Sequence, residues 1–450
     1  MFAYFERDEN LYVTRSLYRG SCQPEITLAI LFNVQIFEQK SARGNTLLSR
    51  KSLGAGVAAL ALLVPLAAPA HAATVTVISL ATWGSSPAET QALNDAIATF
   101  EVRNPLIDVQ QVVHTDHNAQ MIAKFAARTP PDVFYLDAGV AQDWAAQGIL
   151  QDLSSYIAAS SFDTKPFNKS YLAPFKVGSA QYGLPKDANP LVLEGNKTLM
   201  AKAGIKMLPT TTKEFDAAAK LLMKKKITPM CVDADINRLG AYFYSFGGKI
   251  ASGNTSQMNH PGTRAALTWA LTNFKTGAFR TPAQLSAGWA GEAFGKGLCA
   301  FTMEGAWLDP YLRDSFPAVY STMVKGQLPA AKKAGSLAFT AAYAIGKDSA
   351  NKEAAWTFIQ YMTSARGMGI WTSYGVAIPS RSDVATPLGY DVNGLAARAK
   401  TTVTTPSFVG WSKVVDAFNN EAKKQIQNKN FNVSSAVSSI ISKTSAAFPK

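Results

Sequence analysis

The amino-acid sequence predicts an α/β protein with mostly parallel sheets flanked by helices, organised in two domains. Apolar, β-branched runs alternate with runs of helical period along the chain, and this alternation is typical of βαβ units. The chain has 450 residues, which is enough for two domains of ordinary size. A hydrophobic content of 47% and a mean hydropathy near zero indicate a globular protein with substantial cores.

The first seventy residues contain a segment that we expect the mature protein to lack. Arg50 and Lys51 precede a short, alanine-rich apolar run, which ends in Ala70-His71-Ala72. A basic start, a short apolar stretch and small residues at −1 and −3 describe a secretory signal peptide. We place the signal peptide at 47–72, with cleavage after Ala72. A membrane anchor is the alternative, but a spanning helix needs ~20 strongly apolar residues.

Residues 1–46 form a doubtful N-terminal extension. A signal peptide should begin close to its basic pair, yet no Met occurs between Met1 and Met121. A translation start at a non-Met codon near Leu47 would explain this distance. No Cys follows the apolar run closely enough to carry a lipid, so we expect a freely diffusing, periplasmic protein.

The predicted elements follow one another in a regular order. The first group comprises strand 74–80, helix 87–100, strand 107–112, helix 118–127 and strand 131–136. The second group comprises helices 197–203 and 212–225, strand 227–232, helix 261–276, strand 298–303, helix 351–366 and two helices between 411 and 450. A Thr run with Glu214 in the first turn is a start signal for the helix at 212–225.

The charge and the cysteines leave alternatives open. The net charge is +13, and about +11 remains once residues 1–72 are removed. Because the basic residues are scattered, we expect a solvated basic surface and no nucleic-acid partner. Cys231 and Cys299 remain after removal of the leader, and both lie in apolar, strand-like runs. They either pair across neighbouring strands or stay as small buried hydrophobes, and we favour the second by a narrow margin.

Short motifs in residues 74–450 occur in the order typical of one family. The first half contains Phe100-Glu101, Asn104-Pro105, Pro131-Asp132-Val133, Gly148-Ile149-Leu150-Gln151-Asp152-Leu153, Tyr182-Gly183-Leu184-Pro185 and Asn196-Lys197. The second half contains Ala203-Gly204-Ile205, Phe246-Gly247-Gly248, Gly295-Lys296-Gly297, Met303-Glu304-Gly305-Ala306-Trp307 and Gly375-Val376-Ala377-Ile378-Pro379. Together with the export signal, these motifs make the chain resemble the family 1 extracellular solute-binding proteins, the maltose-binding-protein-like components of carbohydrate ABC importers.

The resemblance implies the periplasmic-binding-protein fold. This fold is a two-lobed clamshell in which each lobe is a mostly parallel sheet flanked by helices, and crossover hinge strands join the lobes. The N-lobe would comprise 74–186 and 336–380, and the C-lobe 190–330 and 384–450. Such lobes close by hinge motion around a ligand in the cleft. The implied partners are a carbohydrate or polyol ligand and the transmembrane permease subunits of an ABC importer.

The candidate ligand-binding residues come first from the turns that follow strands, where α/β sheets place ligands. Sugars need flat aromatic faces and planar polar side chains, which Trp83, Ser85 and Asp137 offer there. A half-buried core Trp and a helix cap are the ordinary alternatives for Trp83 and Asp137. The first predicted crossover between the lobes adds Lys186, Asp187 and Asn189.

Further candidates follow from the resemblance. Trp307 and Trp411 match the positions of two aromatic platforms in the family. Asn189 takes the place of an acidic ligand contact. Three more residues match positions of ligand contacts, one in the strand that returns to the N-lobe and two in the C-lobe: Tyr343, Asp235 and Tyr242.

Other functions are weighed against this reading. The sequence has no G-x-S-x-G, H-E-x-x-H or P-loop pattern, so we expect no enzyme, although a secreted carbohydrate-active enzyme with two carboxylates stays as the alternative class. His114 and His117 are spaced like a metal pair, but no Cys or third His is near in sequence and the segment is loop-like, so we expect a surface pair. A glycerophosphodiester or an acidic sugar is the alternative ligand, with Lys186 or Arg238 as its partner. We expect a monomer without a metal or a cofactor.

Overall fold

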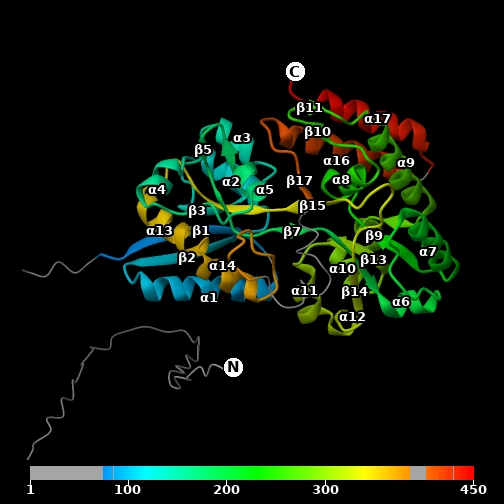
Figure 1. Cartoon of the computed structure of the whole chain (residues 1–450), viewed down its shortest axis with the longest axis horizontal. Helices are drawn as coiled ribbons and strands as arrows, with labels where there is room; N and C mark the ends of the chain where they lie inside the picture. The colour runs from blue at the N-terminus through cyan, green and yellow to red at the C-terminus, as the bar shows by residue number, and fades with distance from the viewer. Residues whose placement is uncertain (1–73, 85, 386–401, 429) are drawn as a thin grey trace, which may run out of the picture. The chain divides into compact units, whose positions relative to one another are not determined.

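The structure, a computed structural model, describes residues 74–84, 86–385, 402–428 and 430–450. The predicted extension, the signal peptide and Ser85 therefore lie outside the described residues. Two five-stranded sheets form the framework of this part of the chain (Figure 1). Among the described residues, no helix combines the length and the apolar character that a membrane crossing requires.

The first sheet has the strand order β2-β1-β3-β16-β6. Its strands are β1 (Thr76–Trp83), β2 (Ile107–His114), β3 (Val133–Asp137), β6 (Leu184–Pro185) and β16 (Ala341–Ile345). β1 pairs in parallel with β2 and β3, whereas β16 is antiparallel to β3 and β6. β16 is therefore the one reversed strand of a mostly parallel sheet. We call this sheet and its helices the N-lobe.

The second sheet repeats this plan, in the order β12-β9-β13-β8-β14. Its strands are β8 (Val192–Asn196), β9 (Thr228–Cys231), β12 (Phe279–Arg280), β13 (Cys299–Glu304) and β14 (Met323–Gly326). β9 pairs in parallel with β12 and β13, whereas β8 is antiparallel to β13 and β14. The reversed strand again takes the fourth place. We call this sheet and its helices the C-lobe.

Two extended segments cross between the sheets. β7 (Asn189–Pro190) leads from β6 to β8, and β15 (Ser336–Phe339) leads from β14 to β16. These crossover segments pair antiparallel with each other, and β15 also pairs in parallel with β17 (Thr402–Thr404). The reversed strand of each sheet is thus the strand that arrives from the other lobe. The predicted clamshell fold with crossover strands is confirmed.

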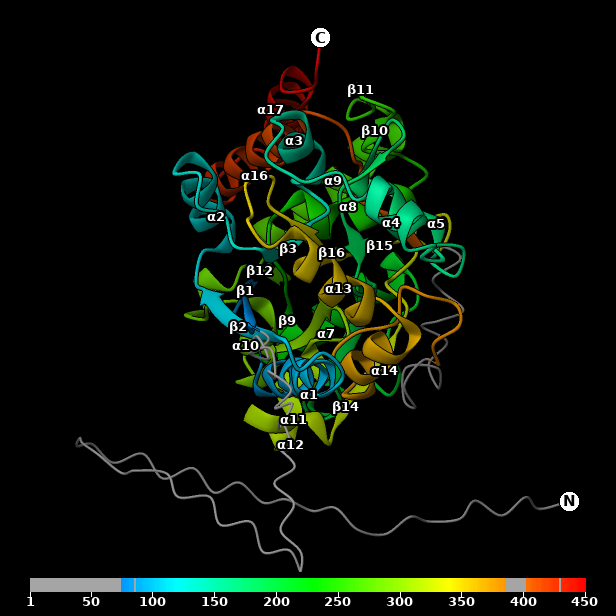
Figure 2. The ribbon, with the colours of Figure 1, turned by 90° about the vertical axis from the view of Figure 1, so that its left-hand side faces the viewer.

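Helices cover both faces of the N-lobe sheet. They are α1 (Pro87–Arg103), α2 (His117–Ala126), α3 (Ala141–Ala146), α4 (Ser154–Ala159), α5 (Lys169–Leu172), the short 3-10 helix η1 (Ala173–Phe175), α13 (Lys352–Met362) and α14 (Ala365–Ser373). α1, α13 and α14 lie on one face and α2 and α3 on the other (Figure 2). The cores on the two faces include Leu80 with Phe358 and Phe134 with Trp144. The ladder of β4 (Lys176–Val177) and β5 (Ala180–Gln181) lies at the edge of this lobe.

The C-lobe sheet is covered in the same way. Its helices are α6 (Lys197–Lys202), α7 (Thr212–Lys224), α8 (Ile236–Ser245), α9 (Pro261–Thr276), η2 (Ala283–Leu285), α10 (Ala290–Gly295), α11 (Leu308–Ser315), α12 (Pro317–Tyr320), α16 (Trp411–Gln427) and α17 (Val433–Ala446). α16 packs against α17, and α17 packs against α9, so the predicted helical pair of the tail joins the C-lobe core. A small hairpin of β10 (Ala251–Ser252) and β11 (Thr255–Ser256) completes the lobe.

The helix starts follow their capping signals. The Thr211 hydroxyl accepts a hydrogen bond from Glu214 N (3.1 Å), and the Glu214 carboxylate accepts one from Thr211 N (3.2 Å), which completes a capping box for α7. The prediction of one helix at 351–366 is wrong. The Ser364 side chain accepts from Gly367 N (3.2 Å) and starts a second helix, α14.

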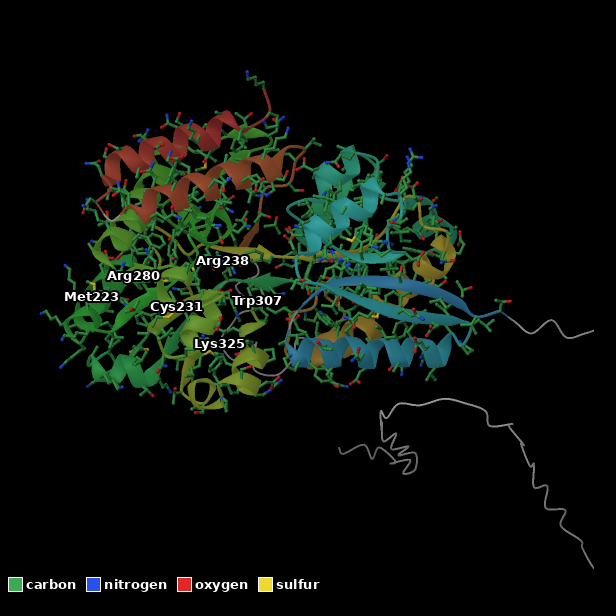
Figure 3. The ribbon with its side chains drawn as sticks, turned by 180° about the vertical axis from the view of Figure 1, so that it is seen from behind. Met223, Cys231, Arg238, Arg280, Trp307 and Lys325 are labelled. Atoms are coloured by element: carbon green, nitrogen blue, oxygen red, sulfur yellow. A yellow bond between two sulfur atoms is a disulfide. The ribbon has the colours of Figure 1, made fainter. Side chains whose placement is uncertain are left out.

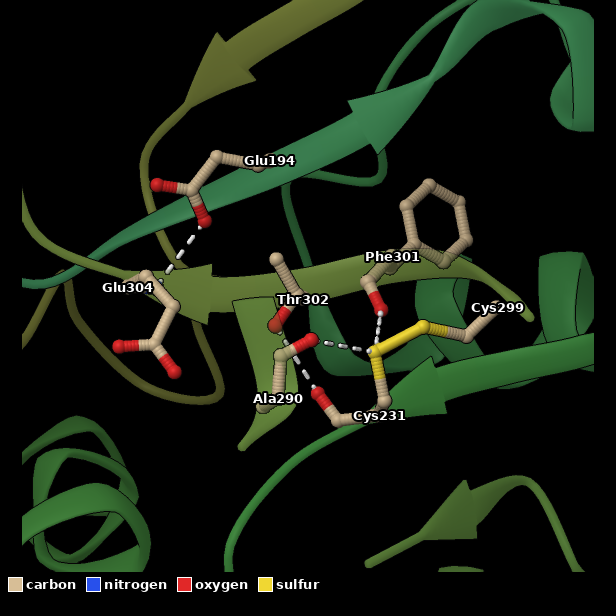
Figure 4. Close-up of a disulfide and its surroundings, with 7 residues drawn as sticks. All are labelled: Glu194, Cys231, Ala290, Cys299, Phe301, Thr302 and Glu304. Carbon is tan, nitrogen blue, oxygen red and sulfur yellow. Dashed lines mark hydrogen bonds between the residues drawn. A yellow bond between two sulfur atoms is a disulfide. The ribbon is translucent and has the colours of Figure 1, made fainter. Parts of the chain in front are cut away.

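Cys231 and Cys299 form a disulfide between β9 and β13, two neighbouring strands (Figure 4). Our preference for separate buried thiols was therefore wrong. Their Cα atoms are 5.8 Å apart, within the range that a disulfide spans. Both cysteines are fully buried, as the apolar sequence around them indicated, but the pairing of β9 with β13 is a tertiary feature that the sequence around them does not contain.

Candidate functional site

A cavity of about 570 Å³ lies between the two lobes, and its volume is typical of small-molecule sites. The N-lobe contributes Trp83, Gly84, Ser86, Pro87, Glu89, Asp137, Lys186, Asp187, Ala341, Trp371 and Val376. The C-lobe contributes Arg238, Trp289, Trp307 and Tyr311, and the crossovers contribute Asn189, Phe339 and Thr340. We call this cavity the cleft. Of the eleven predicted contact residues, the structure brings six to the cleft: Trp83, Asp137, Lys186, Asp187, Asn189 and Trp307.

Trp83 ends β1, at the turn where the sequence predicted it. Its indole packs edge-to-face against Tyr135, with ring centroids 4.8 Å apart, and against His117 at 5.5 Å. The ring is half-buried, so these contacts hold it while it still lines the cleft. Trp83 is therefore both a half-buried Trp that packs on the N-lobe core and a residue of the cleft wall.

His114 and His117 lie behind Trp83 and are not the surface pair that we expected. Their side chains are 5% and 6% exposed, and His117 Nε2 lies 2.8 Å from the carbonyl oxygen of Tyr135. Burial disfavours the charged imidazolium and lowers the pKa of both rings. His114 ends β2 and His117 begins α2, and their rings pack on each other. His117 also packs on Trp83 and so supports the wall of the cleft.

Lys186 carries the first positive charge in the cleft wall. Its Nζ lies 2.5 Å from a carboxylate oxygen of Asp187. It also lies 4.1 Å from the ring centroid of Trp371 and 4.6 Å from that of Tyr135. A cation over aromatic faces and beside a carboxylate is well compensated. Lys186 and Asp187 are 4% and 5% exposed, so their pair is buried.

Asp137 and Asn189 supply polar groups at the edge of the cleft. Asp137 Oδ1 accepts a hydrogen bond from Gly139 N (2.7 Å) in the turn before α3. Burial raises the pKa of the Asp137 carboxyl above its ordinary value, although this hydrogen bond works in the opposite direction. Asn189 is 7% exposed, and its Oδ1 has no hydrogen-bond partner in the described structure. An unpaired buried amide oxygen is a costly group that a ligand hydroxyl can satisfy.

Trp307 is half-buried at the start of α11, on the C-lobe side of the cleft (Figure 3). Its Nε1 donates a hydrogen bond to Glu304 Oε2 (3.2 Å), and its ring meets that of Phe339 edge-on at 5.7 Å. A Cβ on Gly305 would lie 2.3 Å from this indole. The glycine therefore lets the ring lie against the backbone and present its other face to the cleft.

Trp289 repeats this arrangement next to Trp307. A Cβ on Gly291 would lie 2.2 Å from its indole. The ring packs edge-to-face on Tyr311, with centroids 4.8 Å apart. Trp289 and Tyr311 both line the cleft, although our search of the sequence did not select them. Trp289 directly precedes α10 and Tyr311 lies on α11, and both helices pack in one hydrophobic cluster with the two cysteines.

Arg238, on α8, carries the second positive charge of the cleft wall. Its Nη2 donates to Glu304 Oε2 (2.9 Å), and its Nη1 lies 3.6 Å from Asp235 Oδ2. Burial works against the charged guanidinium, but the carboxylates of Glu304 and Asp235 outweigh it and raise the pKa of Arg238. Asp235 caps α8 by accepting from Arg238 N (2.7 Å). Asp235 thus supports a cleft residue and does not itself line the cleft.

Tyr242 and Tyr343 are placed away from the cleft, which corrects two of the expected contacts. Each side chain is 1% exposed. Tyr242 packs on Trp269 in the C-lobe core, and Tyr343 packs on Tyr135 and Phe358 in the N-lobe core. Both sequence positions were assigned by resemblance, but the helix face of α8 and the strand face of β16 turn these rings inward.

Trp411 lies at a second, smaller cavity of about 340 Å³ and not at the cleft itself. It is 1% exposed and packs against Phe408 at the start of α16. The two cavities share the residues Asp137, Phe339 and Thr340. Trp411 is thus a core residue whose position leaves it one layer behind the cleft.

The sequence did not identify Trp371, Trp289, Tyr311 and Phe339, because none of them lies in a turn after a predicted strand, at the first crossover or at a position that the resemblance marks. Trp371 projects from α14, and Trp289 precedes α10. The available signals were a Trp beside small residues in Gly288-Trp289-Ala290-Gly291, and a Trp in the segment that precedes Gly375-Val376. Arg238 had been considered only as a partner for an acidic ligand.

Comparisons with known proteins agree with this architecture. Residues 84–369 match the sequence profile of a family described as bacterial extracellular solute-binding proteins. A protein of Brucella abortus named as a binding protein is 24% identical over 351 residues, which cover 71% of this chain and 81% of that protein.

Solved structures match nearly over their whole length. An ABC substrate-binding protein from Listeria monocytogenes in complex with cycloalternan has a TM-score of 0.74 and 25% identity, and the match covers 82% of this chain and 98% of that chain. A solute-binding protein of an ABC transporter from Thermotoga lettingae, bound with α-D-tagatose, has a TM-score of 0.74 and 19% identity, with 83% and 99% covered. A maltotriose-binding protein from Thermus thermophilus, bound with maltotriose, has a TM-score of 0.69 and 19% identity, with 82% and 99% covered.

Proposed function

Because this chain belongs to the bacterial extracellular solute-binding protein family, we propose that it captures a neutral sugar or sugar-like solute in the cleft and delivers it to the permease of an ABC importer. The observation that carries this proposal is the pairing of aromatic rings from both lobes around one cavity. Trp83 and Trp371 come from the N-lobe, and Trp289, Trp307 and Tyr311 come from the C-lobe. Rings on two sides can cover the two apolar C–H faces of a pyranose.

Polar groups between these rings support the same ligand class. Asn189 Oδ1 and Trp371 Nε1 are buried without a hydrogen-bond partner in the described structure. One is an acceptor and the other a donor, which is the pair that a sugar hydroxyl satisfies. A ligand that lacks such hydroxyls would leave both groups unpaired, at a cost of ~1–3 kcal/mol each.

The charges of the cleft favour a neutral solute over an acidic sugar or a glycerophosphodiester. Lys186 is compensated by Asp187, and Arg238 by Glu304 and Asp235. The cleft is further lined by the carboxylates of Glu89 and Asp137. The basic balance of the whole chain therefore does not extend to its cavity. Neutral carbohydrates named with the matching solved structures, maltotriose and tagatose, fit this preference.

We propose that capture proceeds by hinge motion of the lobes, bounded as 74–186 with 336–380 and 190–330 with 384–450. Support comes from the two crossovers, β7 and β15, which connect the sheets and contribute Asn189 and Phe339 to the cleft. Closure would bring the aromatic rings of the two lobes onto opposite faces of the ligand. The protein would act as a periplasmic monomer after cleavage of the signal peptide near Ala72, without catalysing a reaction.

A thermal-shift screen tests the proposal. The panel contains neutral sugars such as maltose, maltotriose, mannotriose and tagatose, together with uronic acids and glycerol phosphates. A ligand at 100 times its Kd should stabilise the folded protein by ~2.7 kcal/mol. We expect a neutral sugar to give the largest shift, confirmed by titration calorimetry. A response to anionic compounds alone would contradict the neutral ligand, and no response to any carbohydrate or polyol would overturn the function.

A further inference from the structure

The carboxylate of Glu304 lies directly behind the C-lobe wall of the cleft and binds two of its residues. One oxygen, Oε2, accepts a hydrogen bond from Arg238 Nη2 (2.9 Å) and another from Trp307 Nε1 (3.2 Å). The other oxygen, Oε1, is buried and has no partner in the described structure. Glu304 is 0% exposed and does not line the cleft itself. Glu304 therefore does not contact a ligand itself, but it holds two residues that line the cleft.

Without Glu304, the cationic side chain in this wall would be poorly compensated. The carboxylates that would remain near Arg238 are those of Asp235, at 3.6 Å, and of Asp233. Within the described residues, the Nε of Arg238 has no hydrogen-bond partner. The guanidinium also packs on the ring of Phe339, at 5.1 Å from its centroid. The guanidinium is thus held at the cleft, where its N–H groups would be available to donate hydrogen bonds to an anion.

Other charged groups surround Glu304 but do not replace it. The backbone N of Glu304 donates to Glu194 Oε2 (3.0 Å) on the neighbouring strand β8 (Figure 4). Lys325 of β14 pairs with Asp309 of α11, on the far side of Glu194. Asp233 and Asp235 approach from the loop before α8. Glu304 is the one of these acidic groups that binds both Arg238 and Trp307.

We propose that Glu304 is a positioning residue that sets the selectivity of the cleft for uncharged over anionic ligands. It cancels the charge of Arg238 and fixes the indole of Trp307 with the same oxygen. This inference rests on the proposed function and names the residue that decides its charge preference. A carboxylate in a water-poor wall is well suited to this role, because charge compensation between buried groups is strong.

The substitution Glu304→Gln keeps the size of the side chain and removes its charge. We expect Arg238 in this variant to become available to anions. The first experiment needs no cognate ligand and uses inorganic sulfate as its probe. Protein labelled with 5-fluorotryptophan is titrated with sulfate, and the ¹⁹F resonance of Trp307, assigned with Trp307→Phe, is followed.

In Glu304→Gln, sulfate should shift the Trp307 resonance in a saturable manner, with an affinity about tenfold or more above that of the parent protein. The double variant Arg238→Met/Glu304→Gln should lose this response. Glu421→Gln is the matched control, because Glu421 is a buried glutamate of the same lobe (8% exposed) that accepts from Ser439 Oγ and Gln425 Nε2 at 2.6 Å each. It should behave like the parent.

A pH profile provides a second readout in the parent protein. Burial raises the pKa of Glu304, although Arg238 works in the opposite direction. As the pH falls, Glu304 is therefore protonated before carboxyls of ordinary pKa. Sulfate binding should accordingly strengthen at acidic pH in the parent and change far less with pH in Glu304→Gln. Equal profiles would contradict the role of Glu304.

The last arm measures ligand selectivity by calorimetry, with D-glucose against D-glucuronate and D-galactose against D-galacturonate. The ratio of the two affinities should shift toward the uronate by about tenfold in Glu304→Gln. If the parent binds no sugar, the proposed function fails while the sulfate titration still tests the inference. A folded Glu304→Gln variant in which sulfate moves Trp307 no more than in the parent overturns the inference.

Discussion

The two halves of the cleft are held together in different ways. On the N-lobe side, Lys186 and Asp187 are neighbours in sequence, and their ion pair lies among the rings of Trp83, Tyr135 and Trp371. On the C-lobe side, an ion pair and a disulfide join positions that are far apart in sequence. Arg238 and Glu304 are 66 residues apart, and Cys231 and Cys299 are 68 residues apart.

The N-lobe rings are held by core packing, whereas the C-lobe rings are held by specific contacts with a few partners. Tyr135 and Trp371 are buried in the N-lobe core and Trp83 packs against it, so these rings keep their place because the lobe folds. The C-lobe rings, Trp289 and Trp307, are half-buried and lie over glycines, and their orientation depends on specific partners behind them. Changes in the N-lobe half should therefore affect stability and binding together, whereas changes in the C-lobe half should separate the two.

The largest effect should follow removal of the disulfide in the double variant Cys231→Ala/Cys299→Ala. A cross-link that spans 68 residues of sequence restricts the unfolded chain, and its loss should cost about 4 kcal/mol of unfolding free energy. Urea denaturation of the variant and of the parent, with and without reductant, measures this loss. If reductant destabilises the variant as much as it destabilises the parent, the disulfide is not the cause.

Trp371→Ala should have the next largest effect, because Trp371 is 3% exposed and packs on Lys186. Deletion of a buried indole costs about 3 kcal/mol, and the uncovered Lys186 should also weaken ligand binding. Urea denaturation and calorimetry with the best sugar of the screen measure both quantities. If the unfolding free energy of Trp371→Ala stayed within about 0.5 kcal/mol of the parent's, roughly the scatter of surface substitutions, the proposed difference between the two halves of the cleft would be wrong.

Trp307→Ala should weaken ligand binding by at least tenfold, about 1.4 kcal/mol, and leave the fold intact. Its ring is half-buried and supplies a face of the cleft, so its loss removes a ligand contact more than a core contact. Calorimetry gives the affinity and urea denaturation the stability. An unchanged affinity would remove Trp307 from the binding site, and a loss of stability as large as that of Trp371→Ala would erase the difference between the halves.

The smallest effect should come from Gly305→Ala, which changes no side chain that lines the cleft. The new Cβ would lie 2.3 Å from the indole of Trp307 and should push it toward the cleft. Overpacking of this kind costs about 1 kcal/mol, which corresponds to about fivefold weaker binding. The matched control is Gly369→Ala in α14, where no atom lies within 4 Å of the added Cβ. Equal affinities of the two variants would show that the ring does not depend on Gly305.

The sequence predicted the elements well because their signals are local. The helix at 261–276 and the capping box at Thr211 and Glu214 depend on residues within one or two turns. The prediction of one helix at 351–366 failed where Ser364 starts a new helix inside an apolar period, and helices such as α8 and α10 were not predicted. The turn after β1 likewise identified Trp83 without any knowledge of its neighbours.

The candidate site was predicted only in part because burial is not local. Tyr242 and Tyr343 were expected at the ligand, yet each faces a core, and Trp411 lies one layer behind the cleft. Trp371 and Trp289 line the cleft although nothing in their local sequence marks a strand end. A side chain's exposure depends on which element packs over it, and the sequence around it does not contain that information.

The sequence by itself thus determined the alternating elements, since periodicity and caps depend on neighbouring residues. The order of its motifs, through their resemblance to a family, indicated the two-lobed fold and the class of binding protein. The tertiary structure alone decided three features of the C-lobe. It paired Cys231 with Cys299, it turned Trp289 and Trp307 toward one cavity, and it set Glu304 behind Arg238. The disulfide joins β9 to β13, and the ion pair joins α8 to β13, so both depend on contacts between residues that are far apart in the sequence.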